Sequence, residues 1–183
     1  MTKRDNHYEA AFEQYLRSRE VPYVAVDEAR RALTAGDSIK SLDFIVSPEG
    51  GRNWLVDVKG RRFPSGEQKQ YWKNWSTRDD LRGLSRWEEL FGEGFQGLFV
   101  FAYCVVGDRA PLPEEQLFSH RNRLYGFVAI TRDQYASHAR LISPKWDTVS
   151  MPTAGFRNLA QPFEELLSQP APTSLAQQDV APA

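Results

Sequence analysis

The chain has 183 residues, of which 41% are hydrophobic and 13% aromatic, a composition that can close the core of one globular domain. It contains no uninterrupted apolar run of about 18 residues, which argues against a membrane span, and its single cysteine excludes an internal disulfide. The first residues lack the apolar segment of a secretory signal, so we expect a cytoplasmic protein.

The net charge is only −1, but residues 59–86 hold eight Lys and Arg against three Asp and Glu, a local charge of +5. Such asymmetry is compatible with a nucleic-acid-binding face.

The first part of the chain predicts one helix followed by three strands. Phe12, Tyr15 and Leu16 form the apolar stripe of a helix over about residues 6–18. The three strands are PYVAVDEA (22–29), SLDFIV (41–46) and NWLVDVKG (53–60). The turn residues SPEGGR join the last two, so we expect them to form a hairpin.

A polar and aromatic loop (61–76) precedes the second helix, RDDLRGLSRWEELFG (78–92). Thr77 and Asp80 resemble a capping box at the start of this helix. LFVFAYCVV (98–106) is apolar on both faces, as expected of an interior strand. The remaining elements are a strand at 124–130, a helix at 131–140, an extended segment at 146–151 and a partly helical segment at 156–167.

This order predicts an α/β fold of the mixed-sheet, α+β kind, with an αβββαβ core and a C-terminal αβ extension. We expect a single domain over residues 1–167, in which the core covers about 6–106 and the extension about 107–167. The segment 168–183, rich in Pro, Ala, Gln and Ser, predicts a disordered tail.

Charged residues interrupt the most strand-like stretch of the sequence. Because alternate residues of a strand share a face, Asp57 and Lys59 point to one side, and a hairpin can bring Asp43 beside Asp57. Two adjacent carboxylates repel, and a divalent cation between them relieves the repulsion. The alternative is a structural ion pair of these three residues on a solvent-facing sheet.

Asp43, thirteen intervening residues and then Asp57-Val58-Lys59 resemble the signature of the PD-(D/E)XK nuclease superfamily. The predicted order of elements also resembles the restriction-endonuclease-like core of that superfamily. Leu42 stands where a proline is common, and position 57 is Asp where Glu is commoner. The opening HYEAAFE, residues 7–13, also resembles an uncharacterised bacterial family recognised by the string HYExAFE.

The superfamily resemblance implies metal-assisted phosphodiester hydrolysis. Asp43, Asp57 and the Val58 carbonyl would ligate Mg²⁺, for which Mn²⁺ can substitute. The Holliday-junction-resolvase-like branch adds a glutamate from the first helix, which would be Glu9, with Glu13 as the reserve. The catalytic set is then Glu9, Asp43, Asp57 and Lys59, in which Lys59 orients or helps to deprotonate water and stabilises charge on the phosphate.

Basic residues follow the strand that carries Lys59, interleaved with aromatic ones, a combination that suits phosphate contact and base stacking. The candidates for nucleic-acid binding are Arg61, Arg62, Lys69, Lys73, Arg78, Arg82 and Arg86. The last three recur every four residues along the second helix. They form either a phosphate-binding ridge or a solvated face paired with Asp79 and Glu89.

Two functions therefore remain open at this stage. The first is a Mg²⁺-dependent endodeoxyribonuclease with DNA as its partner, without membrane contact, structure-specific and homodimeric by analogy with junction resolvases. The second is a non-catalytic nucleic-acid-binding or protein-interaction module on a nuclease fold.

Overall fold

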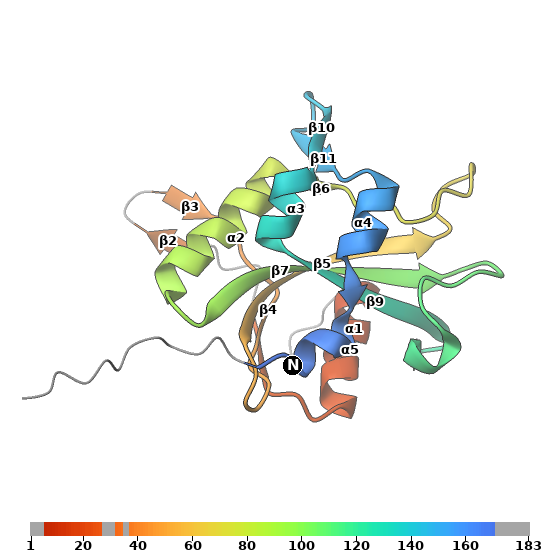
Figure 1. Ribbon diagram of the computed structural model, residues 1–183, viewed down its shortest axis with the longest axis horizontal. Helices are drawn as coiled ribbons and strands as arrows, with labels where there is room; N and C mark the ends of the chain where they lie inside the picture. The colour runs from red at the N-terminus through yellow and green to blue at the C-terminus, as the bar shows by residue number, and fades with distance from the viewer. Residues whose placement is uncertain (1–5, 27–31, 35–36, 171–183) are drawn as a thin grey trace, which may run out of the picture.

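The long strands β5 (Asn53–Phe63) and β7 (Phe95–Val105) form the centre of the fold (Figure 1). The computed structural model describes residues 6–26, 32–34 and 37–170. The two strands pair in parallel over their whole length, from Asn53 opposite Phe95 to Phe63 opposite Val105. A parallel pair needs a crossover connection, which is helix α2 (Arg78–Phe91).

The central sheet has seven strands, in the order β1-β4-β5-β7-β9-β12, with β8 paired to β9. The strands flanking the central pair are β1 (Tyr23–Ala25), β4 (Phe44–Val46), β8 (Phe118–His120), β9 (Arg123–Thr131) and β12 (Gln161–Pro162). The element order α1-β1-β4-β5-α2-β7 is the predicted order of helix, three strands, helix and strand. Strand β9, which belongs to the predicted extension, pairs with β7 and so continues the sheet of the core.

Two smaller sheets accompany the central one. A hairpin of β2 (Ala32–Thr34) and β3 (Asp37–Ile39) is inserted between β1 and β4, and the sequence did not predict it. The second small sheet has the order β10-β11-β6, from β10 (Arg140–Ser143), β11 (Thr148–Ser150) and β6 (Ser76–Thr77). Strand β6 lies directly before α2, so this small sheet adjoins the start of the crossover helix.

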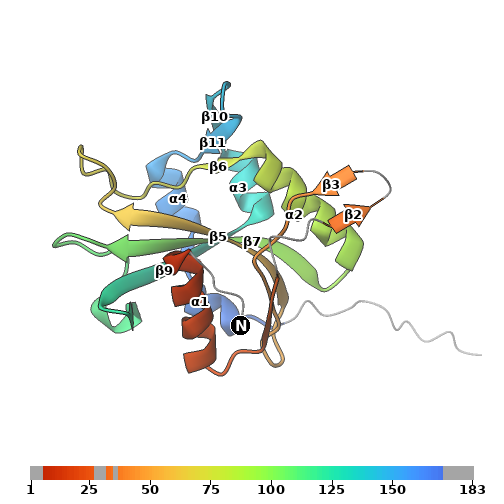
Figure 2. The same cartoon turned by 180° about the vertical axis from the view of Figure 1, so that it is seen from behind.

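Helices cover both faces of the central sheet (Figures 1 and 2). One face carries α1 (His7–Ser18) and α5 (Phe163–Leu167). The other carries α2, α3 (Arg132–His138) and α4 (Thr153–Leu159). A short 3-10 turn, Glu114–Gln116, precedes β8. None of the described helices is long and apolar enough to cross a membrane.

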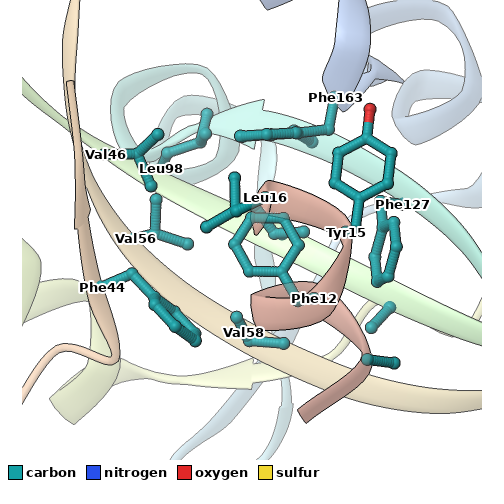
Figure 3. Packing of buried hydrophobic residues seen from close by; sticks show 14 of the residues in the cluster. Phe12, Tyr15, Leu16, Phe44, Val46, Val56, Val58, Leu98, Phe127 and Phe163 are labelled. Atoms are coloured by element: carbon teal, nitrogen blue, oxygen red, sulfur yellow. The ribbon is translucent and has the colours of Figure 1, made fainter. Parts of the chain in front are cut away.

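The core on the α1 face contains a group of packed aromatic rings (Figure 3). Phe12 of α1 packs edge-on against Phe44, Phe127 and Phe163, with ring centroids 4.9–5.4 Å apart. Edge-to-face pairs at such distances add stability beyond the area that they bury. This packing fixes α1 on the sheet, as the predicted apolar stripe requires.

The predicted tail lies almost wholly outside the described residues, which end at position 170. The last described residue, Pro170, forms an isolated antiparallel bridge with Gly51, in the turn between β4 and β5. The described chain therefore ends beside the hairpin that carries Asp43 and Asp57.

Candidate active site

Strand β5 places Asp57 and Lys59 on the sheet face that α2 covers. The two residues alternate with Val56 and Val58, which belong to the core under α1. Lys59 Nζ lies 2.8 Å from Asp57 Oδ1, and the side chains of Lys59 and Asp57 are only 13% and 9% exposed. The two residues therefore share a face of the strand, as predicted, and form a buried ion pair there.

Asp80 of α2 completes this ion pair as a third member that the sequence did not assign to the site. Its Oδ2 lies 3.1 Å from Lys59 Nζ, and its other carboxylate oxygen pairs with Lys40. Asp80 also accepts hydrogen bonds from the Thr77 amide and the Ser76 hydroxyl, each 2.8 Å long. The predicted capping box of Thr77 and Asp80 is present. One carboxylate thus begins α2 and anchors the lysine of β5.

The charges of the three residues are strongly interdependent. Burial raises the pKa of Asp57, and the nearby Asp80 carboxylate adds to this, against the opposing effect of Lys59. Burial alone would lower the pKa of Lys59, but Asp57 and Asp80 outweigh it and the pKa is raised. Lys59 and Lys40 overcome burial at Asp80 and hold its pKa well below the ordinary value. Lys59 is therefore an ammonium at neutral pH.

Asp43 lies on the neighbouring chain segment, level with Asp57. The register pairs Phe44 with Val56, and its continuation sets Asp43 opposite Asp57. The Asp43 carboxylate is buried, and its Oδ2 accepts a hydrogen bond of 2.6 Å from the Val58 amide. The charge of a further carboxylate, that of Asp80 on α2, raises the pKa of Asp57.

Of the two glutamates predicted from the first helix, Glu9 is buried and Glu13 binds partners at the rim of the helix. Glu9 lies in the first turn of α1 and accepts a hydrogen bond from the Asn6 side chain, the N-cap of that helix. Glu13 binds Arg17 and the Tyr23 hydroxyl, each at 2.9 Å. Glu9 is thus the carboxylate that faces the interior.

The start of α1 is held close to β5 by a glycine. A side chain at Gly60 would overlap the ring of Tyr8, which lies directly against the strand. This contact sets the helix turn that contains Glu9 on the α1 face of β5, opposite to the face that carries Asp57 and Lys59. The absence of a Cβ at position 60 therefore determines how closely the predicted helix carboxylate approaches β5.

The carboxylates of Asp43 and Asp57 are the candidate ligands of a magnesium ion in this site. Among the described residues, no group of three or more His, Cys, Asp or Glu side chains is arranged to hold a metal. Mg²⁺ is usually bound by one or two carboxylates, with water and substrate phosphates completing its coordination. Asp43 and Asp57 supply such a pair on adjacent chain segments. The donor set thus fits a weakly held Mg²⁺ that substrate helps to bind.

A narrow hollow opens beside the ion pairs. Its lining includes Lys40, Leu42, Asp57, Asp80 and Trp87. The indole of Trp87 donates a hydrogen bond of 2.9 Å to the Lys40 carbonyl, which fixes the outer wall.

The two arginines that follow Lys59 face opposite sides of the sheet. Arg61 is buried, donates to the carbonyls of Gly60 and Trp75, and stacks on the Trp75 ring with 3.8 Å to the centroid. Arg62 is exposed on the other face. The structure therefore gives Arg61 a role inside the protein and leaves Arg62 accessible to a ligand.

The other candidates for nucleic-acid binding lie on the loop before α2 and on α2 itself. Lys69 is exposed and Lys73 is half-buried. On α2, Arg78 and Arg82 approach Asp147 at 3.5 and 3.9 Å, Arg82 approaches Asp79 at 3.6 Å, and Arg86 pairs with Glu89 at 2.6 Å. Exposed pairs of this kind contribute little to stability and exchange readily for other partners.

Comparisons with known proteins bear on the fold. No family model matches the chain, and no curated protein matches it, so the resemblance of residues 7–13 to the HYExAFE family is not supported. Among solved structures, the chain is similar to Hjc, a Holliday junction resolvase from the archaeal hyperthermophile Archaeoglobus fulgidus. The TM-score is 0.53 at 10% sequence identity, and the match covers 88% of this chain and 98% of the other. The chain therefore has the mixed α/β fold of resolvases and restriction endonucleases, as its sequence predicts.

Proposed function

We propose that the protein is a metal-dependent endonuclease that hydrolyses phosphodiester bonds of DNA. One observation carries the proposal: in a chain with a resolvase-like fold, Asp57 and Lys59 form a buried ion pair on β5, with Asp43 level with Asp57. Buried charges lower the stability of a sheet through their loss of hydration. Their presence here therefore favours a chemical role over a purely structural one.

Asp43, Asp57 and the Val58 carbonyl would hold Mg²⁺ or Mn²⁺. Glu9 would contribute directly or through water, although its helix α1 lies on the sheet face opposite to the one that carries Asp57 and Lys59. A bound divalent cation lowers the pKa of a coordinated water and screens charge on the phosphate. Asp43 is already oriented by the Val58 amide, so its carboxylate keeps a fixed direction before any ligand arrives. This preorganisation suits a site in which geometry provides most of the catalysis.

Lys59 would stabilise negative charge on the phosphate that is attacked. Its raised pKa makes it a poor proton acceptor, so orientation of water and charge stabilisation are its roles rather than deprotonation. Asp80 acts through Lys59, since its carboxylate pairs with the ammonium. Asp80 is thus a positioning residue.

The proposed substrate is branched DNA, and the proposed location is the cytoplasm. Arg62, Lys69, Lys73 and the arginines of α2 would bind phosphates around the site. A homodimer belongs to the same proposal, because symmetric cutting of a four-way branch requires two active sites.

Cleavage of a substrate panel tests the proposal. Linear duplex, four-way branched and single-stranded DNA are incubated with Mg²⁺, with Mn²⁺ and with a chelator. We expect metal-dependent cutting by the wild type, none by Asp57→Asn, and normal cutting by Asp108→Asn, a control at an exposed position. Cutting that survives both the chelator and Asp57→Asn would remove the site from consideration.

One observation favours the alternative, a non-catalytic module on a nuclease fold. Asp57 is paired with Lys59, Asp80 with Lys59 and Lys40, and Asp43 with the Val58 amide. A network satisfied in this way is stable without a metal. If DNA binds but no metal supports cutting in any substrate, the alternative replaces the nuclease.

A further inference from the structure

The hairpin of β10 and β11 projects from the sheet face that carries α2, α3 and α4 (Figure 1). We call its strand β10 and the turn that follows, residues 140–147, the hairpin tip. Its tip exposes three large apolar side chains. Trp146 is 68% exposed, Ile142 58% and Leu141 43%. Trp146 is the most exposed of the large hydrophobic residues in the described part of the chain. Side chains of this kind gathered on one projecting element indicate a contact surface.

The hairpin tip is also basic. It holds Arg140 and Lys145, neither of which forms an ion pair within the described residues, whereas the acidic Asp147 turns back toward Arg78 and Arg82. The ammonium of Lys145 lies 5.1 Å from the centroid of the Trp146 ring. The tip therefore presents an aromatic ring, two aliphatic side chains and two cations.

The base of the hairpin is rigid although its tip is exposed. Asn74 is buried, and its Oδ1 accepts hydrogen bonds of 2.8 Å from both the Met151 amide and the Ser150 hydroxyl. The Tyr135 hydroxyl lies 2.7 Å from the Asn74 carbonyl and 3.1 Å from the Val149 carbonyl. A hairpin tied down in this way presents its tip at little further cost in conformational entropy on binding.

The hairpin adjoins the candidate active site through the start of α2. Strand β11 pairs with β6, and the Arg78 amide donates a hydrogen bond of 3.0 Å to the Asp147 carbonyl. Two residues further along the same helix turn, Asp80 holds Lys59. A polymer that occupies the site and extends past the start of α2 therefore reaches the hairpin tip.

We propose that the hairpin tip is a wedge that contacts unstacked bases of branched DNA beside the active site. Trp146 stacks on a base, Ile142 and Leu141 fill the space between base steps, and Arg140 and Lys145 bind the flanking phosphates. Apolar wedges flanked by cations are a general means of holding distorted nucleic acid. The inference rests on the proposed function, because it assumes that DNA is the substrate.

A second copy of the chain fits the tip less well. A stable dimer interface buries about 800 Å² on each partner and has a large apolar centre. The narrow tip offers three partly exposed apolar side chains together with two cations, and like charges would face each other across a symmetric contact.

Binding without cleavage tests the wedge. Affinities of the full chain for four-way branched DNA and for linear duplex of the same sequence are measured in a chelator, with 2-aminopurine at the branch point. For Trp146→Ala with Ile142→Ala, we expect roughly tenfold weaker binding to branched DNA, little change for the linear duplex, and loss of the rise in 2-aminopurine emission. Trp146→Phe should recover part of the affinity. Leu90→Ala, at a residue 46% exposed on the far end of α2, is the matched control and should bind as the wild type does.

Unchanged preference for branched DNA in the double variant overturns the wedge. The wedge is also overturned if the double variant binds DNA normally but no longer self-associates or no longer binds anionic lipid vesicles. The tip would then be a dimer contact or a membrane contact. Failure of the proposed function has a different signature. In that case the wild type binds branched DNA through the tip but cuts nothing with Mg²⁺ or Mn²⁺. A wild-type protein that binds neither branched nor linear DNA overturns both the wedge and the proposed function.

Discussion

The Lys59 ammonium lies 3.1 Å from Asp80 Oδ2, so the lysine of strand β5 is anchored by the first turn of helix α2. The same ammonium lies 2.8 Å from Asp57 Oδ1. The two aspartates that share one cation differ in how they tolerate charge. Burial raises the pKa of Asp57 and so disfavours its charged form. Asp80 is stabilised as a carboxylate by two lysines and by the cap of α2, which lower its pKa. Substitution of each should therefore affect folding differently.

We expect Asp80→Asn to destabilise the protein and Asp57→Asn to leave its stability nearly unchanged or raised at pH 7. Loss of the Asp80 charge weakens the helix cap and removes an ion-pair partner of Lys59 and Lys40. Together these effects should lower the free energy of unfolding by about 2–4 kcal/mol. Urea denaturation followed by circular dichroism measures both. A greater loss for Asp57→Asn than for Asp80→Asn would contradict the assigned charge states.

The stability difference between wild type and Asp57→Asn should depend on pH. A carboxyl whose pKa is raised by folding contributes stability that is present at low pH and is lost as the pH rises through its folded pKa. The wild type should therefore gain on Asp57→Asn as the pH falls from 7 toward the ordinary aspartate value near 4. Asp80 has the opposite sign, since its lowered pKa contributes stability that is lost on acidification. Urea midpoints at several pH values, measured for the wild type and for both variants, separate the two effects.

Lys59→Ala should abolish DNA cleavage and also weaken the fold. Its removal leaves the buried Asp57 carboxylate without its ion-pair partner and leaves Asp80 with Lys40 alone, which costs about 3 kcal/mol or more. Asp57→Asn should abolish cleavage with the fold intact. Nicking rates measured together with melting curves distinguish the two. A Lys59→Ala protein that cuts at the wild-type rate would remove Lys59 from the reaction.

Mg²⁺ or Mn²⁺ should raise the melting temperature, because a ligand bound only by the native state stabilises it increasingly as the ligand concentration rises. The rise should disappear in Asp43→Asn. The asparagine oxygen can still accept from the Val58 amide, so the metal-free protein should keep its stability. Since phosphate oxygens complete the coordination of Mg²⁺, titration with Mn²⁺ in the presence of DNA is the decisive measurement. No metal binding under those conditions would end the nuclease hypothesis.

Arg61→Ala and Arg62→Ala should have opposite consequences. Removal of Arg61 leaves the Trp75 carbonyl without its donor and the Trp75 ring without its stacked partner, at a cost of about 2 kcal/mol in stability. Arg62→Ala should leave stability unchanged and reduce both DNA affinity and its dependence on salt, since fewer counterions are released. Denaturation and anisotropy at several salt concentrations test the pair. Equal effects on stability would show that the two faces are not distinct.

The parts of the site that follow from local periodicity were predictable. Alternation along one strand places Asp57 with Lys59, and the hairpin turn brings Asp43 level with them. The same alternation extends to Arg61 because β5 continues to Phe63, but the arginine pair was assigned to a loop. Asp80 carried only its capping signal, since its contact with Lys59 depends on how α2 docks across the sheet. No local pattern encodes that docking.

The parallel pairing of β5 with β7 has a consequence for the order in which the protein assembles. Parallel strands form only after the chain between them has closed its crossover, and such long-range pairing is slow. The crossover here is α2, whose first turn delivers Asp80 to Lys59. The charge network therefore comes into existence in the same event that completes the sheet. A nascent or partly folded chain lacks an anchored Lys59, so the site matures only in molecules whose central sheet is already finished.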